Sequence, residues 1–518
     1  MTARSAAVWV LLAVLWFGTL GLRPLYKADE SRYGEISREM VASGDWVTPR
    51  LNGFKYFEKP PLQYWTTAAL FSVLGEHDWV ARLWTALIGF AGIVLTLYAG
   101  NRLFGPPIGA YAAAILAGSP LYVLLGQVNT LDMSVSVFLA AAIFAVASGR
   151  MLLFWAACAL AVLSKGLIGI VLPLAAIALY ALLKRDWSLP WRMRPVAGLA
   201  LFLAIAAPWF IAVSAANTEF AHFFFVQEHF QRFTTQMHQR VHPPWYFIPV
   251  LLAGFAPWLV PLGRALYRTV RERTDTELLL GCWVAVVFVF FSASGSKLPP
   301  YILPIFPALA VLAARGVTTG TLKWQSIAAI PLALGAGLAI WKLGAGGPYA
   351  AYAEWLVMAA LVLVAGAAAA LWLTSRSRLM VAVLVLALGG LGTTLLGTVG
   401  HYTLSDRFSV ASTVRSLPSS IPADAPVFAV DTYDHTIPWS LKRTVSMVHY
   451  RDELGVAIDW DAGQFVADLG AFARAWNAAP QAWAFVGVNA DIDELSKRLG
   501  TPMQEVARGP TFAIVKKP

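Results

Sequence analysis

Several acidic and basic side chains stand close to the ends of long apolar segments, where an ionisable group is costly unless it faces a polar cavity. Asp29, Arg32 and Tyr33 are spaced so that a helix would place them on one side. The other members of this group are Glu58, Lys59, Asp132, Lys165, His229, Lys297 and Tyr301. Basic side chains that meet carboxylates at one membrane face predict a site for an anionic, phosphate-bearing substrate.

Each of these residues also has a purely structural explanation. Asp29 can begin a helix, where the helix dipole stabilises a carboxylate. Arg32 and Lys59 can extend from the membrane interface toward lipid headgroups, and Asp132 can cap the helix that follows it. Lys165 is harder to explain in this way, because it stands alone in a short turn between two apolar segments. The combination, rather than any single residue, indicates a reaction site.

The elements that carry these residues belong to a polytopic α-helical membrane protein. Of the 518 residues, 58% are hydrophobic and 13% are charged, and the mean hydropathy is +0.63. This composition leaves too little polar surface for a soluble globule of this size. The apolar segments predict about thirteen transmembrane helices, at 6–22, 79–100, 107–126, 131–148, 150–163, 166–183, 196–216, 245–263, 278–293, 300–317, 325–343, 353–373 and 379–399.

The distribution of basic residues predicts the orientation in the membrane. If the N-terminus is cytoplasmic, the inside loops hold most of the basic residues, among them Arg150, Arg271 and Arg376. The short outside loops then hold little besides Lys165 and Lys297. This positive-inside pattern places the C-terminal segment outside, and it accounts for the formal charge of +10 without nucleic acid as a partner. The first apolar segment is expected to be a retained signal anchor.

The chain is predicted to have a large membrane domain followed by a small exported one. Residues 1–400 form the transmembrane catalytic domain, with longer exported loops at 23–78 and 217–244. Hydropathy falls beyond residue 400, and residues 401–518 are predicted to form a periplasmic α/β domain. Within that domain we expect strands at 427–430, 445–448, 483–488 and 512–515, and helices at 464–476 and 492–499.

The first exported loop is predicted to contain two helices. Residues 29–41 have apolar side chains on one face and are followed by Gly44, which favours a helix end. The pair Pro60-Pro61 keeps Lys59 extended and opens a second helix over 62–74. Two such amphipathic helices are expected to lie at the membrane interface, as a rim or plug over the bundle.

A series of segments gives the chain a family resemblance. The first loop closely resembles that of the bacterial aminoarabinose transferases that modify lipid A. These enzymes belong to the GT-C glycosyltransferases that use polyprenyl-phosphate sugars, which also include protein mannosyltransferases. The similar segments, in chain order, are 29–40 (DESRYGEISREM), 43–46, 49–53, 56–61, 228–233 (EHFQRF), 296–301 (SKLPPY), 438–441 and 450–454.

The resemblance implies a GT-C fold and an enzyme of the inner membrane, expected to be a monomer. It would move 4-amino-4-deoxy-L-arabinose from undecaprenyl phosphate to lipid A on the periplasmic face. An alternative is a related transferase that glycosylates a different glycan, lipid or protein hydroxyl. A transporter or flippase is a further alternative, but it predicts polar groups near the bilayer midplane and paired broken helices, whereas the charges here cluster on one face without an internal repeat.

The resemblance also implies roles for the ionisable residues. It assigns Arg32, Lys59 and Lys297 to the donor phosphate, with Lys165 and Tyr301 as companions. Asp29 is the first candidate for the acidic catalytic residue, and Asp132 is the second. Other expected substrate contacts are Tyr33, Tyr56 and Glu58.

A divalent metal, zinc or magnesium, is compatible with the resemblance but is not required by it. Glu58 and His229 would be the ligands, with His242 as a conjecture for a third. Two ligands are fewer than such sites normally have, and the aspartates do not form a close Asp-x-Asp pair.

The predicted orientation can be tested by labelling. A cysteine introduced at Asn217 or Ser419 should react in whole cells with a membrane-impermeant reagent added from outside. A cysteine introduced at Arg271 should not react, because the positive-inside pattern places it in the cytoplasm. The opposite labelling pattern would overturn the orientation.

Overall fold

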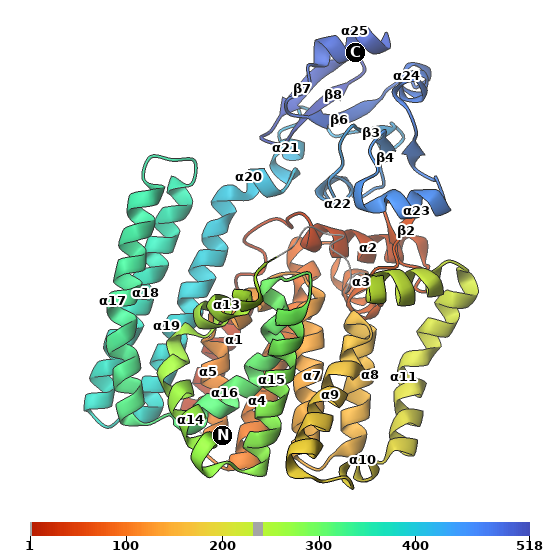
Figure 1. Cartoon of the computed structure of the whole chain (residues 1–518). Coiled ribbons are helices and arrows are strands. Elements are labelled where there is room, and N and C mark those ends of the chain that lie inside the picture. The colour runs from red at the N-terminus through yellow and green to blue at the C-terminus, as the bar shows by residue number, and fades with distance from the viewer. Residues whose placement is uncertain (1–2, 232–241) are drawn as a thin grey trace. The chain divides into compact units, whose positions relative to one another are not determined.

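The computed structural model describes residues 3–231 and 242–518, which form two compact units (Figure 1). The helical unit comprises Met1–Leu20, Glu58–Gln63 and Arg82–Gly400. The mixed unit comprises Gly21–Phe57, Tyr64–Ala81 and His401–Pro518. One boundary between the two units follows Gly400, and most of the first loop packs in the same unit as the C-terminal segment.

Every predicted transmembrane segment coincides with a helix or with a bent helix pair. In chain order these are α1 (Ala3–Phe17), α4 (Asp78–Phe104), α5 (Ile108–Ala117) with α6 (Pro120–Gly126), α7 (Leu131–Ala147), α8 (Met151–Lys165), α9 (Ile168–Lys184), α11 (Pro195–Ala216), α13 (Phe247–Gly254) with α14 (Leu259–Glu272), α15 (Asp275–Ala293), α16 (Phe306–Gly316) after the short helix η4 (Pro299–Ile305), α17 (Thr319–Gly344), α18 (Ala350–Ser375) and α19 (Leu379–Gly400).

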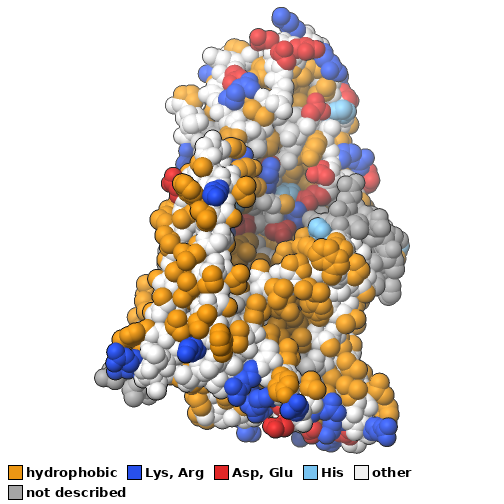
Figure 2. All heavy atoms as spheres, turned by 60° about the vertical axis from the view of Figure 1, so that its left-hand side comes forward, with side chains coloured by type: hydrophobic (Ala, Val, Ile, Leu, Met, Phe, Trp, Pro, Cys, Tyr) orange, Lys and Arg blue, Asp and Glu red, His pale blue; other side chains and the backbone are white. Residues whose placement is uncertain are grey.

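The lengths of these helices support a multi-pass membrane protein. Within the described residues, seven helices are long and apolar enough to cross a bilayer, or up to nine if each bent pair is one span. The others, α1, α7, α8 and α9, have 15 to 17 residues. Figure 2 shows hydrophobic side chains over the flank of the helical unit and Lys and Arg side chains gathered at one end. A hydrophobic flank and a basic end fit a bilayer and the positive-inside rule.

Two of the predicted spans are not single straight helices. The segment 107–126 bends by 65° between α5 and α6, and 245–263 bends by 73° between α13 and α14. Pro120 stands at the first position of α6, and Pro257 lies in the turn between α13 and α14. Proline has no N–H to continue the helical ladder, so each bend coincides with a residue that favours a break.

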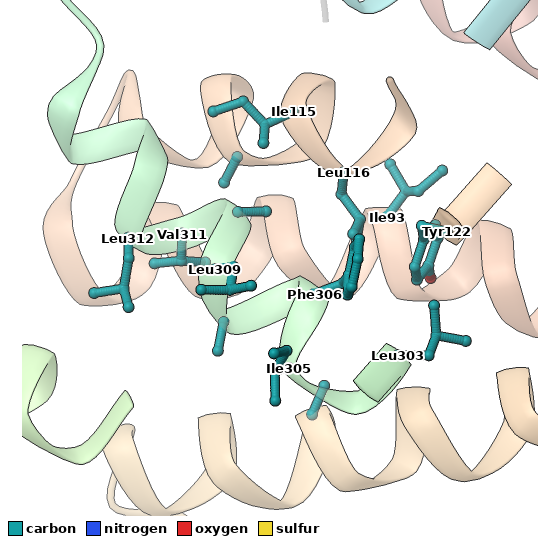
Figure 3. Close-up of a cluster of buried hydrophobic side chains, with 14 of the residues drawn as sticks. Ile93, Ile115, Leu116, Tyr122, Leu303, Ile305, Phe306, Leu309, Val311 and Leu312 are labelled. Carbon is teal, nitrogen blue, oxygen red and sulfur yellow. The ribbon is translucent and has the colours of Figure 1, made fainter. Parts of the chain in front are cut away.

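The core of the helical unit surrounds α16. All residues from Phe306 to Ala314 are buried, and Figure 3 shows Phe306 beside Ile93 of α4, Leu116 of α5 and Tyr122 of α6. A Cβ added at Gly316 would lie 1.9 Å from the carbonyl oxygen of Pro261, so this glycine permits close approach to α14. Small residues of this kind allow membrane helices to pack closely. The packing of α16 fixes the segment before it, which carries Lys297 and Tyr301.

The mixed unit contains a sheet with strand order β5-β4-β3-β6-β8-β7. The strands β3 to β6 are parallel, and β8 is antiparallel to both β6 and β7. Apolar clusters cover both faces, one around Phe428 and Trp476 and the other around Ile437 and Phe485. The strands are β3 (Val427–Val430), β4 (Ser446–Val448), β5 (Phe465–Val466), β6 (Trp483–Gly487), β7 (Gln504–Arg508) and β8 (Phe512–Lys516), with helices α24 (Leu469–Ala478) and α25 (Ile492–Leu499).

The sequence pattern located the four apolar strands but not β5 and β7. The strand β5 has only two residues and lies where a helix over 464–476 was expected, so the helix begins later, at Leu469. The strand β7 is a polar and largely exposed edge strand, and its residues lack the alternation of a half-buried strand.

The first loop folds into α2 (Asp29–Ser43), the hairpin β1 (Arg50–Leu51) and β2 (Phe54–Lys55), and α3 (Leu62–Leu74). The helix α2 ends at Gly44, whose φ of 71° permits the expected cap. Every residue of α2 from Glu30 to Met40 is buried within the protein, so this helix is covered by other parts of the chain on its polar side as well. Its charges are compatible with burial because they are paired, as in the bidentate contact of Arg38 with Glu35.

Asn52 links this hairpin to the strand region of the mixed unit. Its side chain is fully buried, donates to the carbonyl oxygen of Val445 at 2.9 Å and accepts from the Val445 N–H at 2.8 Å. Its φ of 54° lies in the left-handed region that asparagine and glycine tolerate.

We expect Asn52→Gly to open this contact, because glycine keeps the backbone conformation but leaves both polar groups of Val445 without a partner. The local loss should be about 2 to 4 kcal/mol. Hydrogen exchange should then become faster in β1, β2 and β4. Asn489→Gly, at an exposed turn, is the control, and equal exchange in the two variants would contradict this role of Asn52.

Candidate active site

The packing of α7 against α8 brings Asp132 and Lys165 together. Asp132 lies in the first turn of α7, where the Thr130 hydroxyl donates to its Oδ2 at 2.8 Å. Lys165 is the last residue of α8, and its Nζ contacts Oδ1 of Asp132. The same ammonium lies 5.0 Å from the centroid of the Tyr301 ring. Lys165 therefore has the carboxylate partner that its isolated place in the sequence did not reveal, and the Tyr301 ring lies beside it.

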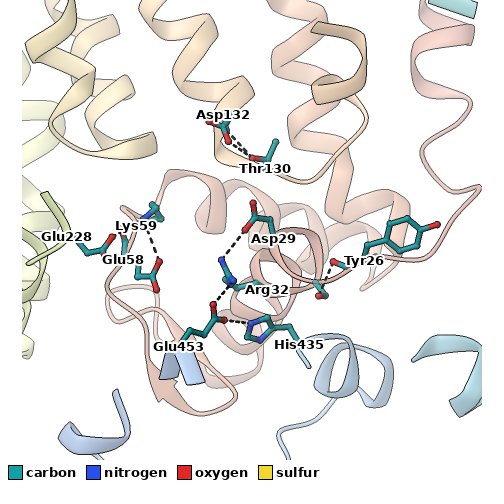
Figure 4. Close-up of polar contacts among 11 residues, drawn as sticks. Tyr26, Asp29, Arg32, Glu58, Lys59, Thr130, Asp132, Glu228, His435 and Glu453 are labelled. Atoms are coloured by element: carbon teal, nitrogen blue, oxygen red, sulfur yellow. Dashed lines mark hydrogen bonds and ion pairs between the residues drawn. The ribbon is translucent and has the colours of Figure 1, made fainter. Parts of the chain in front are cut away.

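Lys59 stands in a second charged cluster of the helical unit (Figure 4). Its Nζ donates to the Glu58 carbonyl oxygen at 2.8 Å and to Glu228 Oε2 at 3.2 Å, and Glu58 Oε2 lies 3.7 Å away. Glu228 belongs to the short helix η1 (His222–Gln231). The three side chains are between 11% and 19% exposed, so they are poorly hydrated and their mutual attraction is stronger than at a surface.

Lys297 is a buried cation in the segment between α15 and η4. The residue is only 4% exposed, and its Nζ donates to the carbonyl oxygen of Ser294 at 2.6 Å. Within residues 3–231 and 242–518, this carbonyl is its one hydrogen-bond acceptor, and no carboxylate lies within 4.0 Å. An ammonium has three donors, and burying it without a counter-ion costs several kcal/mol. This arrangement favours an anion supplied from outside the chain.

The mixed unit holds a chain of four ionisable residues (Figure 4). Arg32 donates from Nη1 to Asp29 Oδ1 at 3.0 Å and from Nη2 to Glu453 Oε2 at 2.6 Å. The other oxygen of Glu453 contacts Nε2 of His435. Asp29 is half exposed, whereas the Arg32 side chain is 10% exposed. The arginine assigned to the donor phosphate is thus held by two carboxylates in this structure.

This network keeps Arg32 and Glu453 charged. Burial alone would lower the pKa of Arg32, but Tyr56, Glu453, Tyr33 and Asp29 raise it well above its ordinary value. Burial opposes ionisation of Glu453 too, yet its contacts with His435 and Arg32 lower its pKa to about 2. The stabilisation from Glu453 is therefore fully present above the ordinary carboxyl pKa and is lost as the pH falls through about 2.

The two tyrosines assigned to substrate contacts lie near Arg32. Tyr33 and Tyr56 are 4% and 3% exposed, and the rings of Tyr33 and Tyr64 are 5.9 Å apart. Arg32 Nε is buried and has no hydrogen-bond partner among the described residues. The two tyrosines therefore lie close to the Arg32 guanidinium, whose Nε–H is an unused hydrogen-bond donor among the described residues.

One of the two expected metal ligands lies outside the described part of the structure, because the side chain of His229 is not described, and nor are residues 232–241. Glu58 Oε2 lies 3.7 Å from the ammonium of Lys59, and His242 stacks on Tyr246 with ring centroids 4.3 Å apart. Over 3–231 and 242–518, no group of three or more His, Cys, Asp or Glu side chains is arranged to hold a metal ion. The expected metal site therefore stays a prediction.

Sequence reasoning did not assign Glu228, Glu453 or His435. Glu228 and Glu453 lie within segments that carry the family resemblance, so a signal was present. Their partners, Lys59 and Arg32, are 169 and 421 residues away, and sequence spacing cannot reveal such contacts. His435 lies outside the resembling segments and carried no signal.

Comparison with known proteins agrees with these features. The model of the dolichyl-phosphate-mannose-protein mannosyltransferases matches residues 58–211, and that of the aminoarabinose transferase C-terminal domain matches residues 412–517. The undecaprenyl phosphate-α-4-amino-4-deoxy-L-arabinose arabinosyl transferase of Aeromonas hydrophila is 36% identical over 328 residues, which cover 61% of this chain and 60% of the relative. Its counterpart in Erwinia tasmaniensis is 34% identical over 351 residues, covering 64% and 63%. The chain thus matches about three fifths of the length of these curated relatives.

Solved structures match over almost the whole length. The crystal structure of ArnT from Cupriavidus metallidurans bound to undecaprenyl phosphate has a TM-score of 0.94 and 33% identity, and the match covers 100% of this chain and 98% of that one. The apo structure of the same protein has a TM-score of 0.91 and 33% identity, with coverage of 99% and 98%. The family models, the solved relatives, the many apolar helices and the C-terminal sheet all agree. The chain therefore belongs to the ArnT family of GT-C glycosyltransferases.

Proposed function

We propose that this chain transfers 4-amino-4-deoxy-L-arabinose from undecaprenyl phosphate to lipid A, at the periplasmic face of the inner membrane. The observation that carries the proposal is the buried ammonium of Lys297, which has a carbonyl but no carboxylate as a partner among the described residues. The relatives named above are arabinosyl transferases, and the Cupriavidus metallidurans structure is bound to undecaprenyl phosphate. A lipid phosphate is the anion that Lys297 lacks.

Charge on this phosphate grows during the reaction. The acceptor oxygen forms a bond to the anomeric carbon, the bond from that carbon to the phosphate oxygen breaks, and its electron pair leaves with the phosphate. The donor is a phosphodiester with one negative charge, whereas the released undecaprenyl phosphate is a monoester with a charge of about −1.5 to −2 near neutral pH. Cations at this position bind the transition state more strongly than the ground state.

The lysines of the helical unit differ in how they are occupied before the donor binds. Lys297 has donors to spare, whereas Lys59 is bound by Glu58 and Glu228. A lipid phosphate that reaches Lys59 must therefore compete with Glu228 for the ammonium. Lys165 keeps Asp132 as its partner, and we assign Asp132 to orienting this lysine against the Tyr301 ring.

The role of Asp29 depends on the acceptor. A hydroxyl acceptor must lose a proton, and a carboxylate acting as general base typically accelerates such a step by about a hundred- to ten-thousand-fold. A lipid A phosphate is already anionic near neutral pH, because the second pKa of a phosphate monoester is about 6. We propose a phosphate acceptor, for which Asp29 binds the amino group of the sugar or stabilises positive charge at the anomeric carbon. Its half-exposed carboxylate is accessible for such a contact.

Replacing Lys297 with methionine separates the effect of its charge on stability from its effect on sugar transfer. Lys297→Met retains most of the side-chain volume but removes a buried charge that lacks a carboxylate partner, so the protein should be at least as stable as the wild type. Sugar transfer should fall by about a hundredfold or more, because the growing phosphate charge loses its partner. Lipid A mass spectrometry and thermal unfolding in detergent measure the two effects.

Lys59→Ala should also reduce transfer strongly. Lys323→Ala, which alters an exposed lysine at the start of α17, is the control and should change little. Transfer at the wild-type rate by both Lys59→Ala and Lys297→Met would refute phosphate binding by these lysines.

The pH profile of Asp29→Asn tests the nature of the acceptor. Activity should fall steeply, and alkaline pH should not restore it, because a phosphate acceptor has no proton to lose near neutrality. A donor without the amino group should suffer less from the substitution. Rates measured from pH 6 to about 10 with both donors decide this, with the exposed Asp459→Asn as control. Alkaline recovery that is independent of the amino group would favour a hydroxyl acceptor instead.

A further inference from the structure

The sheet of the mixed unit has a topological switch point between β3 and β6. These parallel strands are neighbours, but the chain leaves β3 through α22 (Thr436–Leu441) toward β4, and it leaves β6 through α25 toward β7 and β8 on the opposite side. In open α/β sheets, ligands bind in the crevice at the carboxyl ends of strands where the connections diverge in this way.

A cavity lies at this point of the sheet. Its volume is about 520 Å³, within the range of small-molecule sites. It is lined by Thr432–His435 after β3, Tyr450–Leu454 after β4 and Val488 after β6. We call this cavity the switch-point crevice. All of its lining residues belong to the mixed unit, and two of them, His435 and Glu453, are joined to Arg32 by the contacts described above.

His435 gives the switch-point crevice a polar group without a partner. The residue is 5% exposed, and its Nε2 contacts Oε1 of Glu453, while its Nδ1 has no hydrogen-bond partner among the described residues. Glu453 is an ionised acceptor, so a hydrogen is assigned to Nε2. A hydroxyl group can satisfy the Nδ1 atom, because a hydroxyl can both donate and accept a hydrogen bond.

The charges around the switch-point crevice select the kind of ligand. Carboxylates are supplied by Asp434, Asp452 and Glu453, and cations by Lys27 and Arg451. Lys27 lies 3.7 Å from Asp434, and Arg451 contacts Asp459, so both cations are occupied. An additional anion would meet an excess of carboxylate, which disfavours phosphate. Hydroxyl and amino groups would find acceptors, and the ring of Tyr450 offers an apolar face.

We propose that the switch-point crevice is a second substrate site, which binds a sugar ring rich in hydroxyl or amino groups through His435 Nδ1. The inference rests on the proposed function, which supplies two sources of such a ring, the sugar of the donor and the sugar backbone of the acceptor. Glu453 contacts His435 with one oxygen and Arg32 with the other. A sugar bound to His435 would therefore be separated only by Glu453 from the guanidinium of Arg32, which is assigned to the donor phosphate.

The test uses a substitution that removes the Nδ1 atom but keeps a donor to Glu453. In His435→Gln the amide nitrogen can replace Nε2 as the donor to Glu453, while the imidazole ring and its Nδ1 atom are lost. The full chain in detergent micelles is titrated with methyl 4-amino-4-deoxy-L-arabinoside, with methyl glucosaminide and with inorganic phosphate, and binding is followed by saturation-transfer NMR. Hydrogen exchange over 432–435 and 450–454 locates the bound sugar.

We expect a methyl glycoside to bind, to protect these segments, and to lose affinity about tenfold or more in His435→Gln. His449→Gln, an exposed histidine of the same unit, is the matched control and should bind as the wild type does. Preference for the arabinoside assigns the crevice to the donor sugar, and preference for the glucosaminide assigns it to the acceptor. Binding of phosphate alone, equal affinity in wild type and His435→Gln, or no protection of these segments would overturn the inference.

These measurements detect binding without turnover, so their outcome does not depend on whether the proposed function is correct. A chain that binds the glycoside through His435 but does not modify lipid A would refute only the proposed function. A chain that modifies lipid A while His435→Gln binds sugar normally would refute only the second substrate site.

Discussion

The cost of burying a charge without a partner governs both units of this protein. In the helical unit, Lys59 and Lys165 stand at the ends of apolar segments and are each held by a carboxylate. Lys297 differs from these two lysines, since the one acceptor of its ammonium among the described residues is a backbone carbonyl. A fold does not gain stability from such a group. Its retention is therefore best explained by an anion that arrives during function, and a polyprenyl phosphate is the anion that fits the family.

The same constraint shapes the mixed unit. Its helix α2 is buried from Glu30 to Met40 although seven of these eleven residues are polar or charged. The burial is possible because charged side chains are paired nearby in space, as Arg23 with Glu30 and Arg38 with Glu35. One pair crosses from α2 to the C-terminal segment, where Glu453 binds both Arg32 and His435. The first loop and the C-terminal segment therefore form a single unit, despite their separation in sequence.

The sequence predicted what depends on local pattern. The predicted apolar segments coincide with helices, Gly44 marked the end of α2, and Pro60-Pro61 marked the start of α3. Contacts between distant residues could not be predicted in this way, because spacing carries no information about which helices meet. The partners of Lys165 and Arg32 are examples, and so is the burial of the polar side of α2. The weak strands β5 and β7 were missed because one is too short and the other too polar to show a periodic signal.

The central claim is that basic side chains of the helical unit bind the donor phosphate, which must displace a carboxylate of the chain, that of Glu228, to reach Lys59. The affinity of the purified protein for undecaprenyl phosphate, compared between the wild type and Glu228→Gln, tests it most directly. If the phosphate competes with Glu228, neutralising this residue removes the competitor, and binding should become tighter by about tenfold, which corresponds to about 1.4 kcal/mol. Weaker or unchanged binding in Glu228→Gln would contradict the claim.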